Sequence, residues 1–191
     1  GCGHEFCWIC MGPWKGHTTC NKYAGAEAST GDGAGDLQRY AHFFKRFHAH
    51  EKAQEYANVG QRDAMSALTA AYRFDVMDVE FLDVAVNEIV SCRRFLKWTY
   101  AHAYIVGLGA KAHSQQLFEF QQSQLEETLE SLSHIMETVA WSSHLSSASP
   151  PAQDFYTSRH KVLSLLRVLR ASFDSLSLVL RDGDAREPGD G

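Results

Sequence analysis

The sequence predicts a mainly α-helical protein, in which an elongated helical bundle follows a small N-terminal zinc-binding module. Two observations predict this fold. Apolar residues recur at three- and four-residue steps through most of residues 37–181, where no strand-like alternation of useful length occurs. Four of the five cysteines, in contrast, lie within the first twenty residues, at a spacing that suits a metal ion.

The cysteine-rich start predicts a structural zinc site. Cys7 and Cys10 form a Cys-x-x-Cys turn that directs two thiolates at one cation, and His17 and Cys20 supply a second pair of ligands. Three sulfurs and one imidazole leave no position for water, so this zinc would hold structure. Cys2 lacks partners, and we assign it to a second zinc site whose other ligands precede the chain. We therefore expect the chain to be a fragment.

Other uses of clustered cysteines fit less well. A disulfide scaffold is unlike one tight cluster followed by a long stretch with the single thiol of Cys92. A redox Cys-x-x-Cys belongs in a βαβ context, and helices follow here. His4 beside Glu5 lacks the second histidine of a zinc protease motif.

Composition limits the class of protein. With 191 residues and a hydrophobic share of 45%, the chain can form one sizeable core and a small appended module. The net charge of −5 argues against a nucleic-acid partner. No apolar run is long enough to span a membrane and no signal peptide is visible. Reduced cysteines in a zinc pattern suit the cytoplasm or nucleus.

The helical region is expected to begin after a linker. Residues 24–36 are small, polar and Gly-rich, which predicts a flexible linker. A first helix should begin near Asp36 as its cap, and Gly60 interrupts its pattern. We expect the histidines of this helix to face solvent or a partner: His42, His48 and His50. One face carries an apolar stripe: Leu37, Tyr40, Phe44 and Phe47.

Four further helical segments follow. We expect them at about residues 64–74, 76–106, 114–145 and 155–181, with a disordered tail over 182–191. The helix over 76–106 is apolar nearly all round at its end, at Trp98 and Ile105, which predicts burial at the centre of the bundle. Cys92 within it is expected to be a small core residue. Basic residues of the last helix form a solvated face or bind an acidic partner: Arg159, His160, Lys161, Arg167 and Arg170.

The N-terminal motif resembles a known family. The chain contains the phrase Phe6-Cys7-Trp8-Ile9-Cys10-Met11-Gly12-Pro13-Trp14, followed by His17 and by Cys20-Asn21-Lys22-Tyr23. This pattern is similar to the end of the catalytic zinc domain of Ariadne-type RING-between-RING ubiquitin ligases. The interval from His17 to Cys20 is shorter than usual in that family. By this resemblance, residues 1–23 are the end of the zinc domain, with Cys2 as the last ligand of its first site.

The helical region resembles the Ariadne domain that follows in those ligases. Leu37-Gln38-Arg39-Tyr40 matches the opening of its first helix, and Cys92-Arg93 with Thr99-Tyr100 and Ala103-Tyr104 matches its third. Phe118 to Glu126 is similar to the F-E-x-x-Q-x-x-L-E segment of the next helix. The resemblance thus covers nearly the whole chain and divides it into a zinc module (1–23), a linker (24–36), a helical Ariadne domain (37–181) and a tail (182–191).

The resemblance implies a function and its partners. In the family, a cysteine accepts ubiquitin from a ubiquitin-conjugating enzyme as a thioester and passes it to an amine of a protein substrate. The family order places that cysteine upstream of Cys2, so the fragment carries no catalytic residue and is expected to be inactive alone.

The family also implies regulation. The Ariadne domain inhibits the catalytic cysteine until a neddylated cullin-RING ligase releases it. Glu130 aligns with a restraining glutamate and Tyr56 with the aromatic member of a restraining pair, whereas Ala57 replaces the carboxylate of that pair. A surface carboxylate on a helix is the alternative interpretation of Glu130.

Two non-enzymatic functions stay open. The chain could belong to a non-catalytic zinc-containing module that binds proteins, or to a zinc knuckle that binds single-stranded nucleic acid. The ligand intervals of two, six and two residues and the acidic balance both disfavour the zinc knuckle.

Overall fold

A computed structural model of the chain describes residues 12–13, 20–23, 33–71, 79–106, 112–145 and 153–184. These residues are mainly α-helical, which confirms the predicted class. The helices are α1 (Gly33–Tyr56), α2 (Arg62–Ala71), α3 (Glu80–Val106), α4 (Ala112–Thr138), α5 (Trp141–Leu145) and α6 (Gln153–Asp184), with a π-helical turn, η1 (Ala57–Gln61), between α1 and α2. The predicted ligands Cys2, Cys7, Cys10 and His17 lie outside the described residues.

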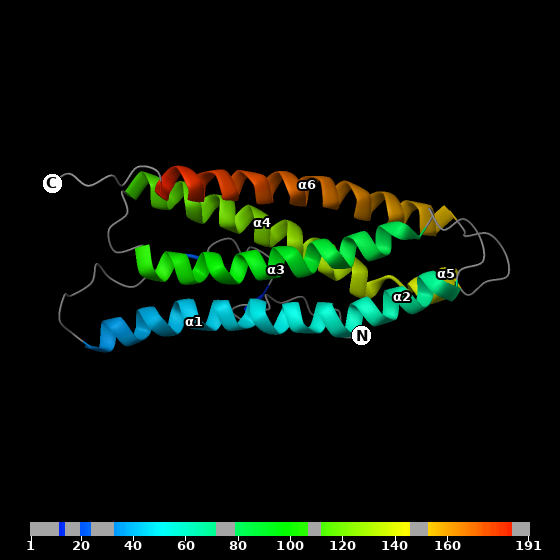
Figure 1. Ribbon diagram of the computed structural model, residues 1–191, viewed down its shortest axis with the longest axis horizontal. Helices are drawn as coiled ribbons and strands as arrows, with labels where there is room; N and C mark the ends of the chain where they lie inside the picture. Colours follow the sequence, from blue (N-terminus) through cyan, green and yellow to red (C-terminus); the bar gives the residue numbers. More distant parts are fainter. Residues whose placement is uncertain are drawn as a thin grey trace.

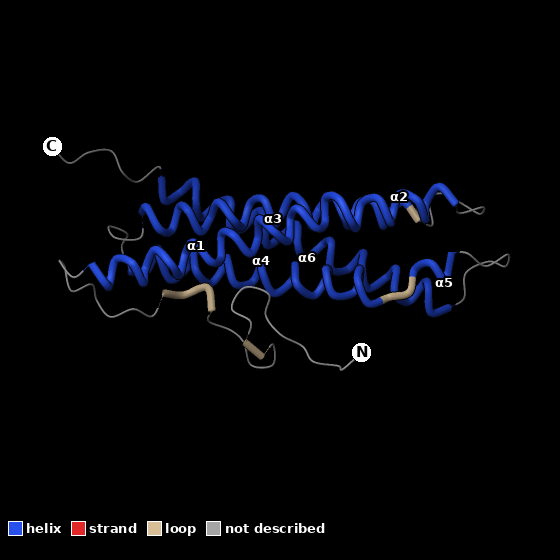
Figure 2. The backbone as a smooth tube through the Cα atoms, turned by 90° about the horizontal axis from the view of Figure 1, so that it is seen from below, coloured by secondary structure: helices blue, strands red, loops and turns tan. Residues whose placement is uncertain are grey.

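The long helices run side by side and make the domain elongated, as predicted (Figure 1). Helix α1 packs against α3, and α4 packs against α6, while α3 also contacts α4 and α6. Helices α2 and α5 contact each other at one end (Figures 1 and 2). Helix α3 is therefore the element that connects both helix pairs.

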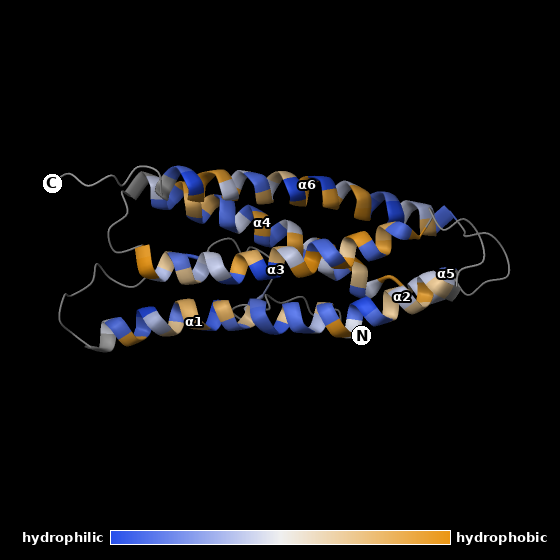
Figure 3. Cartoon of the chain, in the orientation of Figure 1, coloured by the Kyte–Doolittle hydropathy of each residue, from blue (hydrophilic) through white to orange (hydrophobic). Residues whose placement is uncertain are grey.

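The core follows the apolar periodicity of the sequence. Along α3, Leu82, Ile89 and Leu96 are fully or almost fully buried, at seven-residue intervals. Leu129 of α4 and Leu169 of α6 are buried in the same cluster. Figure 3 shows hydrophobic residues recurring among hydrophilic ones along these helices. The sequence pattern therefore predicts the main core correctly.

Cys92 is confirmed as a core residue. Its burial raises the pKa of the thiol to about 12. The thiol therefore stays protonated at neutral pH, which makes it a poor nucleophile.

Several predicted boundaries are wrong. Helix α1 begins at Gly33, so the last residues assigned to the linker are helical, and Asp36 lies in the first turn, where its charge favours the helix N-terminus. The helix does not stop at Gly60, because η1 carries the chain on into α2. Helix α6 continues through residues 182–184, and residues 185–191 lie outside the described range.

The helix expected over residues 114–145 is two helices. Helix α4 ends at Thr138, and α5 begins at Trp141. The Trp141 indole donates a hydrogen bond to the Met136 carbonyl at 3.2 Å, and its ring is buried against Phe81 and Phe155. Burial of this one large side chain explains the break.

One apolar stripe is largely exposed, and one prediction of apolar burial is wrong. Leu37, Tyr40 and Phe44 of the expected stripe are exposed, because α1 contacts α3 through a neighbouring face. Trp98 and Ile105 are exposed although α3 is central, and the Trp98 ring meets Phe47 of α1 edge-on.

Candidate functional site

A chain of polar contacts joins the segment Cys20–Tyr23 to the helices. Asn21 is only 4% exposed, and its Nδ2 donates to the Glu119 carbonyl of α4 at 2.7 Å and to Gln122 Oε1 at 3.4 Å. Gln122 Nε2 donates in turn to Thr99 Oγ1 of α3 at 2.7 Å. The segment is thus connected through α4 to the central helix.

Arg46 of α1 holds the same segment from the other side. Its Nε and Nη2 both donate to the Cys20 carbonyl, while Nη1 donates to the His42 carbonyl at 2.9 Å. These charge-assisted bonds fix the backbone at Cys20. Cys20 itself is half-buried.

His42 and Tyr23 complete this contact. His42 Nε2 lies 3.3 Å from the Asn21 carbonyl oxygen, and the His42 ring meets the Tyr23 ring edge-on at a centroid distance of 5.2 Å. Burial, and then the Arg46 guanidinium, lower the pKa of His42 to about 4. His42 is therefore neutral at pH 7, and its Nε2–H can donate to that carbonyl.

A second group of buried polar residues follows along the same helices. His50 of α1 is fully buried, and its Nε2 lies 3.0 Å from Glu126 Oε1 of α4. The Tyr100 hydroxyl of α3 donates to the same oxygen. Burial, and then the Glu126 carboxylate, raise the pKa of Tyr100 well above its usual value, so the phenol keeps its proton.

Glu130 belongs to a third group. It is 9% exposed and accepts a hydrogen bond from Arg93 Nη1 of α3, whose Nη2 donates to Ser133 Oγ at 3.2 Å. Burial alone would lower the pKa of Arg93, but the Glu130 carboxylate outweighs it and keeps the pKa above its usual value. Glu130 is therefore not a surface carboxylate, because it balances a buried charge.

We call these three groups together the polar seam: Cys20–Tyr23, His42, Arg46, His50, Arg93, Thr99, Tyr100, Gln122, Glu126, Glu130 and Ser133. Three buried side-chain atoms of the seam have no hydrogen-bond partner within the described structure, which is uncommon in a protein interior. They are Asn21 Oδ1, His50 Nδ1 and Arg93 Nε; Gln54 Oε1 of α1, outside the seam, also lacks a partner there.

Only part of the predicted site falls on the polar seam. Cys20 and Glu130 belong to the polar seam. Tyr56 does not, because its side chain is 59% exposed at the end of α1. The neighbouring Ala57 is buried. Within the described ranges, no group of three or more His, Cys, Asp and Glu side chains could hold a metal ion. The zinc site therefore stays a prediction.

Sequence reasoning missed the other members of the polar seam. The expectation that His50 faces solvent or a partner is wrong, because Glu126 and Tyr100 enclose it. A signal was present: Phe43, Phe47 and His50 share one helical face, so a buried polar position was predictable from the spacing.

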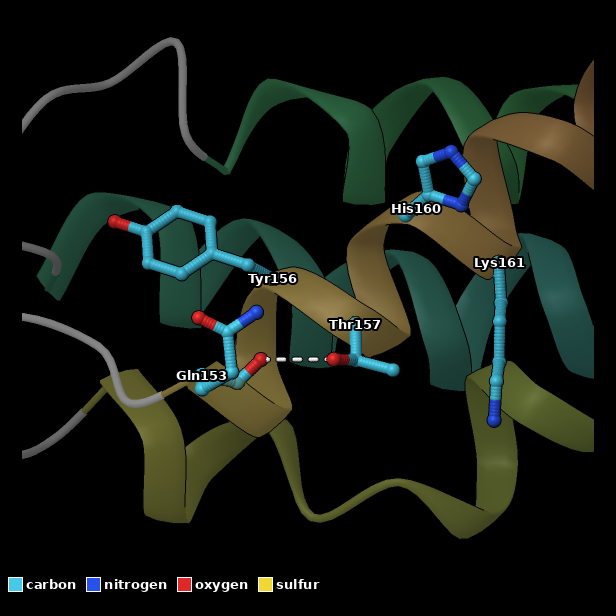
Figure 4. Close-up of a pocket in the computed structure, with 5 residues that line it drawn as sticks. All are labelled: Gln153, Tyr156, Thr157, His160 and Lys161. Carbon is cyan, nitrogen blue, oxygen red and sulfur yellow. Dashed lines mark hydrogen bonds between the residues drawn. The ribbon is translucent and has the colours of Figure 1, made fainter.

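A shallow hollow on α6 offers no comparable chemistry. Figure 4 shows its five lining residues, which all come from one helix: Gln153, Tyr156, Thr157, His160 and Lys161. The Thr157 hydroxyl donates back to the Gln153 carbonyl at 3.0 Å. No helix that the structure describes is long and apolar enough to cross a membrane.

Comparison with curated proteins finds relatives along most of the chain. The E3 ubiquitin-protein ligase dbl4 of Schizosaccharomyces pombe is 35% identical over 150 residues, 71% of this chain and 29% of that protein. The probable E3 ubiquitin-protein ligase ARI10 of Arabidopsis thaliana is 32% identical over 190 residues, 95% of this chain and 36% of that protein. The E3 ubiquitin-protein ligase ariadne-1 of Drosophila melanogaster is 30% identical over 176 residues, 86% of this chain and 34% of that protein.

The chain thus spans about a third of the length of the curated relatives it matches. No protein-family profile matches it.

Proposed function

We propose, since this chain is related to the Ariadne-type ubiquitin ligases, that it is the C-terminal part of a RING-between-RING ligase that transfers ubiquitin through a cysteine thioester. The observation that carries the proposal is similarity to ARI10 over 95% of the chain. That extent is longer than the helical region alone, and leucine-rich helices by themselves would not produce it.

The proposed reaction has two steps. A cysteine thiolate N-terminal to Cys2 attacks the thioester between ubiquitin and its conjugating enzyme, and the enzyme's thiol leaves. An amine of the protein substrate then attacks the new thioester, which forms an amide and frees the cysteine thiol. None of the 191 residues is assigned a part in these bond changes.

Zinc is the proposed cofactor. Cys7, Cys10, His17 and Cys20 would hold one ion, and Cys2 would belong to a second site. The ion would supply structure and no chemistry. Support from the described residues comes from Cys20, whose backbone is fixed by Arg46 and so has a defined place on the helical domain. Such support of a ligand by its surroundings is usual in metal sites.

Regulation by the helical domain is the third part of the proposal. We propose that this domain restrains the zinc module until a neddylated cullin-RING ligase binds, in the cytoplasm or nucleus. Two observations support it: hydrogen bonds hold the segment Cys20–Tyr23 against α1 and α4, and Tyr56 is exposed and therefore available for contact. Glu130 would act indirectly, by holding Arg93 in place.

Sequencing the transcript upstream of Gly1 tests the ligase proposal. We expect a further Cys-x-x-Cys, then a cysteine followed two residues later by histidine, and then the missing zinc ligand before Cys2. An upstream sequence without that cysteine would leave no thioester acceptor. The helical domain would then be the functional part, as a protein-binding surface.

A further inference from the structure

We infer that one water molecule is bound inside the helical domain, between α1 and α3 and beside α4, where it bridges His50, Gln54 and Arg93. It donates hydrogen bonds to His50 Nδ1 and Gln54 Oε1, and it accepts one from Arg93 Nε. A buried water of this kind is part of the structure, because it connects two helices. The inference goes beyond the proposed ligase function and does not depend on it.

Three polar atoms with unmet hydrogen bonds define the site. His50 Nδ1, Gln54 Oε1 and Arg93 Nε are buried, and none of them has a hydrogen-bond partner within the described structure. His50 is fully buried and Arg93 is only 4% exposed. A buried polar group without a partner costs free energy, so ordered water usually bonds such groups when no protein group reaches them.

The three side chains reach neighbouring turns of the same interface. His50 and Gln54 lie one turn apart on one face of α1. Helix α3 runs beside α1 in the opposite direction (Figure 1), and Glu51 Oε1 lies 3.7 Å from Lys97 Nζ. Arg93 is one turn before Lys97 in α3, so it lies beside the turn of α1 that carries Gln54.

Helix α4 brings His50 and Arg93 close together. Its Glu126 lies 3.0 Å from His50 Nε2, and one turn later Glu130 accepts a hydrogen bond from Arg93 Nη1. The Glu126 carboxylate also attracts the Arg93 guanidinium. Adjacent turns of α4 thus hold both side chains, while His50 Nδ1 and Arg93 Nε stay without a protein partner in the described structure.

The hydrogen-bonding roles of the three atoms match one water molecule. The Glu126 carboxylate accepts from His50 Nε2, which leaves Nδ1 of the neutral ring as an acceptor. Gln54 Oε1 is also an acceptor, whereas Arg93 Nε is a donor. A water molecule can donate to the two acceptors and accept from the donor, and three hydrogen bonds are typical of a buried water.

The three protein groups do not satisfy one another directly. Gln54 Oε1 and Arg93 Nε are an acceptor and a donor on facing helices, yet no hydrogen bond joins them. Polar groups that are held further apart than a hydrogen bond are commonly bridged by water. His50 Nδ1 and Gln54 Oε1 cannot bond to each other, because both are acceptors.

A crystal structure of the whole chain tests the site directly. We expect electron density for one water at about 2.7–3.2 Å from each of the three atoms. A direct hydrogen bond between Gln54 and Arg93, or an apolar side chain packed against His50 Nδ1, would overturn the inference.

Oxygen-17 relaxation of the solvent tests the same site in solution, because it counts the water molecules that stay bound for longer than the protein takes to tumble. Gln54→Met removes the acceptor Oε1 and puts an apolar group of similar shape in its place. The count should therefore fall by about one. Gln38→Met is the matched control, because Gln38 is exposed on the same helix, and its count should equal that of the wild type.

Two results of the relaxation measurement would overturn the inference. One is an unchanged count in Gln54→Met, and the other is an equal loss in Gln38→Met. Far-UV circular dichroism reports whether the variants fold; if Gln54→Met does not, the crystal structure of the wild type decides. Neither measurement involves ubiquitin, so their outcome and that of the ligase test can differ.

Discussion

Removal of the Glu130 carboxylate should destabilise the helical domain strongly. In Glu130→Ala, the Arg93 guanidinium stays buried and loses its carboxylate partner, while its bond to Ser133 remains. Loss of one member of a buried ion pair costs roughly 3–5 kcal/mol. Glu126 and Glu137 still attract Arg93, which favours the lower end, about 3 kcal/mol.

Urea unfolding followed by far-UV circular dichroism measures this loss. With an m-value of about 2 kcal/mol per molar urea, a loss of about 3 kcal/mol moves the midpoint down by about 1.5 M. Glu127→Ala is the control on the same helix, because Glu127 is exposed, and its midpoint should change by no more than about 0.25 M.

A double variant separates the ion pair from packing. Arg93→Met combined with Glu130→Leu removes both charges and keeps apolar volume, so it should be more stable than Glu130→Ala. A Glu130→Ala midpoint equal to that of Glu127→Ala would refute the reasoning. It would show that Arg93 does not depend on Glu130.

Three further predictions concern other parts of the chain. Acidification from pH 7 to pH 5 should lower the unfolding free energy of the wild type by about 1 kcal/mol more than that of His42→Gln. The reason is that the pKa of His42 in the folded chain, about 4, lies below its pKa in the unfolded chain. Urea midpoints that fall in parallel for both proteins as the pH is lowered would contradict this. Leu129→Ala should lose about 2–5 kcal/mol in the same assay, because Leu129 is fully buried, and a loss below about 1 kcal/mol would show that the site collapses around the smaller residue. Metal analysis of the reduced chain should find one zinc, and absence of zinc would contradict the site at Cys7, Cys10, His17 and Cys20. Chelation of the zinc should leave the circular dichroism signal of the helices unchanged. Cooperative loss of that signal would show that the helices depend on the metal.

The sequence predicts the helices well because their signals are local. Leu82, Ile89 and Leu96 recur at helical spacing, and all three are buried as expected. Periodicity does not say how many neighbours a helix has. Trp98 and Ile105 were therefore expected inside, although both side chains are exposed.

The polar seam could not be read from local patterns, because its partners lie far apart in the chain. Asn21 meets Glu119 across 98 positions, and His50 meets Glu126 across 76. The spacing of His50 from Phe43 and Phe47 indicates a buried position, but it does not identify Glu126 as the partner. Glu130 was found only through the family resemblance, and its partner Arg93 only through the structure.

The most direct test of the account is whether ubiquitin becomes attached to a cysteine of the complete protein. The protein made from the full reading frame, mixed with a ubiquitin-charged conjugating enzyme, should form an adduct that is larger by one ubiquitin and disappears on treatment with a thiol reductant. The 191-residue chain should form none. Absence of a reducible adduct on the complete protein, with the conjugating enzyme shown to be charged and the helices folded, would contradict the proposed ligase function.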